Sequence, residues 1–124
     1  MNALNNVLIE GNLVRDPDSI NVSDEKTVCK FSIAVNQQYK KNEEIMKSVS
    51  YFDVQVWQNL AESCQKYLRK GNSVRVSGRL KQDRWEDEDG KKYSRVLIVG
   101  EHVDFQGGRK KSKTEKEESA SEAE

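Results

Sequence analysis

Two aromatic residues lie on the polar side of a predicted strand, where burial does not account for them. Alternation over residues 49–57 points Tyr51 and Trp57 the same way as Asp53 and Gln55. An aromatic ring on a wet face needs a partner, either another protein surface or a planar ligand. A nucleobase is such a ligand, because every base has a π face that stacks on an aromatic ring for about 1–3 kcal/mol.

A second predicted strand repeats the aromatic signal and adds positive charge. Over residues 74–85, alternation puts Trp85 on the face that carries Arg75, Arg79 and Lys81. Such cations neutralise phosphates, while the rings stack on bases. The two strands together predict a surface that binds single-stranded nucleic acid, with subunit contact or cover from a loop as the alternative explanation for the rings.

Other candidates flank these strands. A charged segment at residues 39–48 reads as a hairpin loop with an aromatic residue at its base and two lysines after it. The predicted stacking residues are Tyr39, Tyr51, Trp57 and Trp85. The predicted phosphate contacts are Lys40, Lys41, Arg75, Arg79, Lys81 and Arg84.

Catalytic and metal-binding patterns are not found in the sequence. The single histidine, His102, ends a predicted strand, and no phosphate-binding glycine loop or nucleophile elbow is present. Residues 85–96 fail as a calcium loop, because Trp85 and Val96 would occupy the first and last ligand positions. We therefore expect no enzyme activity, no metal and no cofactor. Cys29 and Cys64 lack a metal-ligand spacing and are predicted to be buried thiols.

Composition divides the chain into one domain, residues 1–105, and a tail, residues 106–124. The tail has no aromatic and no branched aliphatic residue, so it is predicted to be disordered. The whole chain has 21 basic and 21 acidic residues, which argues mildly against a nucleic-acid binder. The proposed surface must therefore depend on local charge. No signal peptide or membrane span is visible, and we expect a soluble cytoplasmic protein associated with the nucleoid.

The predicted elements are three strands, one short helix and two more strands. Asn59 is expected to cap the helix in a box with Glu62, Gly71 to adopt the left-handed conformation after the helix, and Gly11 to mark a close approach of the backbone. The strands are predicted at residues 7–14, 28–36, 49–57, 74–85 and 93–105. This order favours an all-β OB-fold, a five-stranded barrel with the helix between strands 3 and 4.

Three segments resemble the bacterial single-stranded DNA-binding protein family. They are VLIEGNLVRDP near the start, YLRKGNSVRVSGRL in the middle and RWEDEDGKKY after it, and the likeness covers residues 4–105. The resemblance implies a tetrameric OB-fold that binds and protects single-stranded DNA in replication, recombination and repair. Its stacking positions correspond to Tyr39, Tyr51, Trp57 and Trp85, two of them tyrosine where well-known members carry tryptophan.

Two departures from the family pattern concern contacts between proteins. Phe52 occupies a position where some members carry a histidine at a subunit contact, which leaves the details of assembly open. The chain ends in ESASEAE, without the Pro-Phe tip through which cellular members recruit replication and repair proteins. The resemblance therefore does not predict recruitment of such partners. A protein-interaction module and a nuclease on the same fold are the remaining alternatives.

Overall fold

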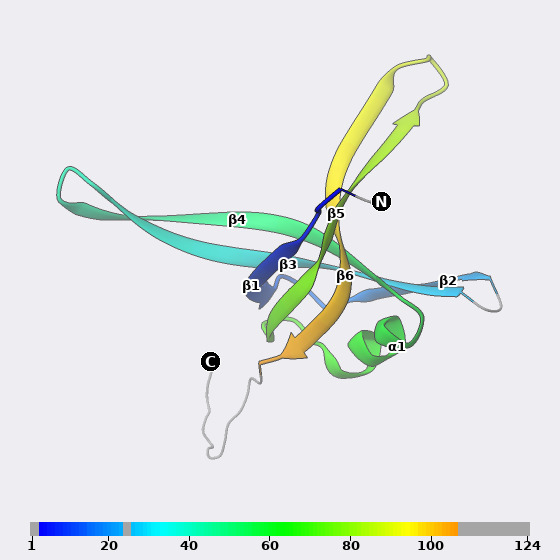
Figure 1. Ribbon diagram of the computed structural model, residues 1–124, viewed down its shortest axis with the longest axis horizontal. Coiled ribbons are helices and arrows are strands. Elements are labelled where there is room, and N and C mark those ends of the chain that lie inside the picture. Colours follow the sequence, from blue (N-terminus) through cyan, green and yellow to red (C-terminus); the bar gives the residue numbers. More distant parts are fainter. Residues whose placement is uncertain (1–2, 24–25, 107–124) are drawn as a thin grey trace.

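A single sheet curls into a closed barrel in the computed structural model, which describes residues 3–23 and 26–106 (Figure 1). Around the barrel the strand order is β1-β5-β6-β4-β3, and β3 closes onto β1. Among the described strands, only the β4–β6 pairing is parallel. The elements are β1 (Val7–Leu13), β2 (Asp18–Ser23), β3 (Lys26–Lys41), β4 (Glu44–Trp57), α1 (Gln58–Tyr67), β5 (Ser73–Glu86) and β6 (Lys92–Phe105).

The predicted five-stranded barrel with a helix before its fourth strand is confirmed. The sequence did not predict β2, a short strand that pairs with the start of β3 and lies outside the closed barrel. The alternating pattern of β2 was not recognisable in the sequence, because most of its residues are polar and the turn residues Asp16 and Pro17 come directly before it. The predicted disordered tail lies outside the described residues, apart from Gln106.

The segment predicted as a charged loop, residues 39–48, is instead the outer half of a long two-stranded arm (Figure 1). β3 and β4 stay paired out to Lys41 and Glu44, so the turn contains only Asn42 and Glu43. Both turn residues have positive φ, 51° and 67°, as a type I′ hairpin requires. The prediction was wrong because a two-stranded ribbon tolerates charged side chains on both of its faces.

A second arm, formed by β5 and β6, projects from the barrel in another direction (Figure 1). Its tip contains the predicted Asp89-Gly90 turn, with Gly90 at φ 82°. The carboxylate of Asp87 accepts hydrogen bonds from the backbone N–H groups of Lys91 and Asp89, both at 2.9 Å. These bonds, that of Lys91 foremost, lower the pKa of Asp87 and organise the tip.

The hydrophobic core lies inside the barrel and under α1. Its fully buried members include Ile33, Val54, Val56, Val74 and Val76. Both cysteines are also fully buried free thiols, as predicted. Burial raises the pKa of Cys29 to about 11 and that of Cys64 to about 12, so both remain protonated at neutral pH.

Alternation predicts burial inside the barrel but not on the arms. Val74 and Val76 are buried as expected, whereas Leu80, expected on the same inner side of β5, is 47% exposed. Phe52 departs in the same way from its neighbours Val54 and Val56. Beyond these points each strand leaves the barrel, so a residue that points inward has no opposite wall to pack against.

The predicted helix cap is wrong, and the predicted glycines are right. Asn59 is the second residue of α1, Trp57 occupies the cap position, and no side chain accepts a cap hydrogen bond there. Gly71 has φ 89°, as expected for the left-handed region. A Cβ on Gly11 would lie 2.5 Å from the carbonyl oxygen of Ala34, which confirms the close approach of β1 to β3.

Candidate nucleic-acid interface

The interface begins on one face of the β3–β4 pair. Trp57, Gln55, Asp53 and Tyr51 follow one another at every second position of β4 and therefore share that face. Directly opposite on β3 are Val28, Lys30, Ser32 and Ala34, respectively. The predicted grouping of two aromatic residues with two polar ones is confirmed, and Lys30 adds a positive charge to it.

The same face continues onto β6 and from there to β5. Gln55 pairs with Val99 in the parallel ladder, so alternation along β6 carries the face through Leu97 to Arg95 and Tyr93. Tyr93 lies opposite Trp85, and the two rings stack at 5.7 Å between centroids with an interplanar angle of 17°. We call this surface the aromatic face, and it comprises Lys30, Tyr51, Trp57, Trp85, Tyr93 and Arg95.

The aromatic rings of this face are exposed enough to meet a ligand. Tyr51 is 66% exposed, Trp85 49% and Trp57 37%. The Arg95 guanidinium lies 6.0 Å from the centroid of the Trp85 ring, within the range of a cation–π contact. The face therefore combines rings for stacking with cations that can meet a phosphate.

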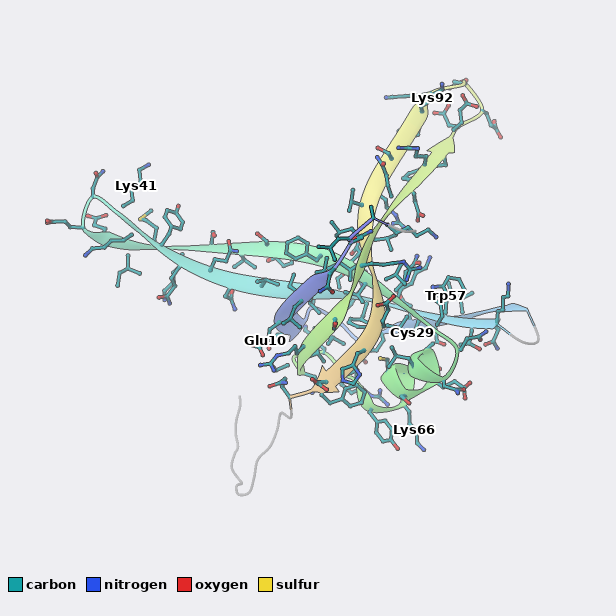
Figure 2. The ribbon with its side chains drawn as sticks, viewed as in Figure 1. Glu10, Cys29, Lys41, Trp57, Lys66 and Lys92 are labelled. Atoms are coloured by element: carbon teal, nitrogen blue, oxygen red, sulfur yellow. The ribbon has the colours of Figure 1, made fainter. Side chains whose placement is uncertain are left out.

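Tyr39 is not brought into the aromatic face. It pairs with Met46, and alternation along β3 places it on the same side as Phe31 and Ile33, opposite to the side of Lys30 and Ser32. Its position is near the end of the β3–β4 arm, beside Lys40 and Lys41. Figure 2 shows Lys41 at the tip of that arm and Trp57 at the barrel end of β4. Tyr39 is half exposed and shares its side of β3 with Lys41, whereas alternation places Lys40 on the side of Lys30 and Ser32.

Three of the predicted phosphate contacts form ion pairs on the surface. Arg75 contacts Glu10 at 2.9 Å, Arg79 contacts Glu101 at 3.0 Å, and Lys81 contacts Asp83 at 3.6 Å. Each pair is largely exposed, and such pairs contribute about 0–1 kcal/mol to stability. A phosphate can therefore compete for these cations at small cost.

Arg84 lies on the opposite face of the β5–β6 arm from Trp85, since neighbouring residues of a strand point to opposite sides. Its guanidinium donates to Oε1 of Gln82 at 2.8 Å, and Gln82 shares that opposite face. The structure thus separates Arg84 from the stacked pair of rings.

Sequence reasoning missed Tyr93, Arg95, Lys30 and Arg15. The last three line, together with Asp53 and Gln55, a hollow of about 140 Å³. A signal for two of them was present in the sequence. The Asp89-Gly90 signal marks the tip of the arm, where Asp87 and Lys91 enclose a three-residue loop. Counting outward from that loop pairs residue 93 with residue 85 and residue 95 with residue 83, whereas a two-residue turn at Asp89-Gly90 would shift the register by one residue.

The residues that could act as catalysts or metal ligands are few. His102 is an exposed surface residue whose Nε2 lies 2.8 Å from Oδ1 of Asp104. Within residues 3–23 and 26–106, no group of three or more His, Cys, Asp or Glu side chains could hold a metal ion. In the same ranges, no helix is both long enough and apolar enough to cross a membrane.

The closed five-stranded barrel, its two long arms and α1, the single helix of the described residues, define the chain as an OB-fold protein. Two solved structures have the same fold as this chain. The chain matches one described as a Plasmodium falciparum SSB complex with ssDNA, with a TM-score of 0.80, 24% identity and coverage of 86% of this chain and 98% of that one. It also matches a deletion variant of the single-stranded DNA binding protein from Thermus aquaticus, with a TM-score of 0.76, 27% identity and coverage of 86% and 52%.

Residues 4–106 match the model of the Single-strand binding protein family, and the chain belongs to that family. A single-stranded DNA-binding protein of Treponema pallidum is 36% identical over 104 residues, and this chain spans 84% of its own length and 58% of that relative. Single-stranded DNA-binding protein 2 of Chlorobaculum tepidum is 37% identical, with coverage of 95% and 81%. A relative in Aquifex aeolicus is 40% identical, with coverage of 81% and 68%.

Proposed function

We propose that this protein binds and protects single-stranded DNA without catalysis and largely without regard to sequence. The observation that carries the proposal is the aromatic face, in which exposed rings and cations lie on one continuous side of the sheet. Family membership and the names of the relatives support the same ligand. The role we infer is in replication, recombination and repair, on DNA in the cytoplasm and its nucleoid.

The mechanism divides the strand between two kinds of contact. Bases stack on Trp57, Tyr51 and the ring pair of Trp85 and Tyr93, each stacked base contributing about 1–3 kcal/mol. Phosphates meet cations that border these rings, foremost Lys30 and Arg95, and then Arg75, Arg79 and Lys81. Tyr39, Lys40 and Lys41 extend the path along the β3–β4 arm. Although the net charge is zero, the basic residues form local patches. The affinity for single-stranded DNA is therefore expected to fall as the salt concentration rises.

We infer that the protein assembles as a homotetramer, in line with the resemblance to tetrameric family members. Within residues 3–23 and 26–106, one edge of β1 is largely unpaired and carries an exposed apolar side chain, which supports this inference. β1 pairs with β3 only at Asn12 and Leu13, and Leu8 on β1 is 71% exposed. Sedimentation should give four times the chain mass of 14.2 kDa, and Leu8→Glu should shift the distribution to smaller species. A wild-type monomer at micromolar concentration would contradict the inference.

Titration with oligo(dT), followed by tryptophan fluorescence, tests the DNA-binding proposal. We expect strong quenching by the single strand and little by a duplex of equal length. Trp85→Ala and Trp57→Ala should each weaken binding by about 5- to 150-fold, equivalent to about 1–3 kcal/mol. Tyr67→Ala is the matched control, because Tyr67 is an exposed aromatic residue on α1 that contacts Phe105 instead of the aromatic face.

Equal quenching by duplex, or unchanged affinity in both tryptophan variants, would contradict the proposal. The interaction-module alternative would then explain the exposed rings. In that case the tryptophan variants should alter the sedimentation pattern and leave DNA binding unaffected.

A further inference from the structure

A hollow of about 140 Å³ lies within the aromatic face, at the junction of β3, β4 and β6. Its polar lining consists of Arg15, Lys30, Ser32, Asp53, Gln55 and Arg95, together with Asp18. Positive side chains come from three different segments, while Asp53 and Gln55 are neighbours on the same face of β4. The hollow is therefore a polar pocket between the stacking groups Trp57 and Trp85.

Gln55 stands out in this pocket because its polar side chain is buried without a hydrogen-bond partner among the described residues. Its residue surface is only 8% exposed, and its side-chain amide makes no hydrogen bond with any other residue in the described part of the chain. A buried amide without a partner costs free energy, so native proteins rarely keep one without a reason. An amide presents both a donor and an acceptor to whatever enters the pocket.

Asp53 supplies the complementary group. Its Oδ1 accepts a hydrogen bond from the Ser32 hydroxyl at 2.6 Å, which fixes the orientation of the carboxylate. No residue of the described ranges donates to its other oxygen, which leaves that oxygen as an acceptor for a ligand. Asp53 and Gln55 together thus offer a fixed acceptor beside a donor on one wall of the pocket.

We propose that this pocket holds the Watson–Crick edge of one base of the bound strand and favours a base whose amino group lies beside a ring-nitrogen acceptor on that edge, namely cytosine or adenine. The amino group donates to Asp53, and the ring nitrogen accepts from the Gln55 amide. Thymine presents a carbonyl oxygen where the amino group would lie, and the Asp53 carboxylate repels it. Lys30, Arg15 and Arg95 at the rim hold the adjoining phosphate.

This inference rests on the proposed function, because it gives that surface a modest base preference at one position. The test compares the dissociation constants of equal-length oligo(dC) and oligo(dT) for the full chain at one salt concentration. In Asp53→Asn the side chain keeps its size and its contact with Ser32, and it gains an N–H that can donate to thymine. The preference for oligo(dC) relative to oligo(dT) should fall at least fivefold.

Asp104→Asn is the matched control, since it removes the same charge from an exposed residue that lies outside the pocket. It should raise both affinities by one common factor. Gln55→Met is the second variant and removes the amide with little change in volume. It should lower the relative affinity for oligo(dC) while the melting temperature stays level or rises, because a purely structural amide would lower that temperature when removed.

Each outcome decides between the hypotheses. If Asp53→Asn and Gln55→Met change both dissociation constants by the same factor, as the control does, the base preference is refuted while DNA binding stands. If the wild-type chain binds neither oligonucleotide, the proposed function and this inference are both refuted.

Discussion

Arg84 and Arg95 lie on opposite faces of the β5–β6 arm, although both are close to Trp85 along the chain or across the arm. Arg95 contacts the Trp85 ring and lines the hollow of the aromatic face. Arg84 points away and donates to Gln82. Sequence distance to Trp85 therefore does not show which of these two cations shares its face, because the strand alternates its side chains.

We predict that Arg95→Ala weakens binding to oligo(dT) by about tenfold and lowers the slope of log affinity against log salt by about one. Arg84→Ala removes the same charge and serves as the control, with an effect at least threefold smaller. Titrations at several salt concentrations measure both quantities. Equal losses in the two variants would show that only the total charge matters and not the face.

At the scale of elements, the junction of β4 with α1 carries backbone strain. Gln58 has φ 58°, a left-handed conformation that costs a non-glycine residue about 1–2 kcal/mol. Its side chain offers little compensation, since Oε1 accepts only a long 3.4 Å hydrogen bond from the Thr27 backbone. The strain sits directly after Trp57, so the turn that starts the helix also ends the aromatic face on β4.

Gln58→Gly should therefore raise the free energy of unfolding by about 1 kcal/mol, because glycine adopts positive φ without steric cost. Gln65→Gly, in the regular part of α1, should lower it by about the same amount. Urea denaturation of both variants gives the comparison. A loss of stability in Gln58→Gly would mean that the Thr27 hydrogen bond outweighs the backbone strain.

At the scale of the whole molecule, the buried thiols tie stability to pH. Burial raises the pKa of Cys29 to about 11 and that of Cys64 to about 12, both from 9.0. In the unfolded chain the thiols ionise near pH 9, whereas in the folded protein they stay protonated. The stability that the two buried thiols contribute is fully present below pH 9. It is lost as the pH rises toward their pKa values in the folded protein.

We predict that the free energy of unfolding falls by about 2–3 kcal/mol between pH 8 and pH 10. Above pH 9, the contribution of each thiol to this free energy decreases by about 1.4 kcal/mol per pH unit. Urea denaturation over this range measures it under reducing conditions. The double variant Cys29→Ala, Cys64→Ala should be less stable at pH 8 but show a shallower decline. An equally steep decline in that variant would assign the pH dependence to other groups.

The architecture and the chemical character of the surface were determined by local sequence. Period-two alternation in residues 29–35 and 54–57 identifies the inner and outer faces, because the side-chain period of a strand is set by its own backbone. The helix, Gly11, Gly71 and the Asp89-Gly90 turn were also readable, since each reflects a backbone demand that few residue types meet. Tyr51, Trp57 and Trp85 were placed on the correct face for the same reason.

Only the tertiary structure decided how far the hairpins extend and which cations accompany the rings. The β3–β4 arm continues through a charged segment because inter-strand pairing, a nonlocal interaction, satisfies its backbone. Leu80 and Phe52 are exposed because the opposite barrel wall ends before them. Lys30 and Arg95 join Asp53 and Gln55 through the pairings of β4 with β3 and β6, and no local pattern encodes the partners of a strand across a barrel.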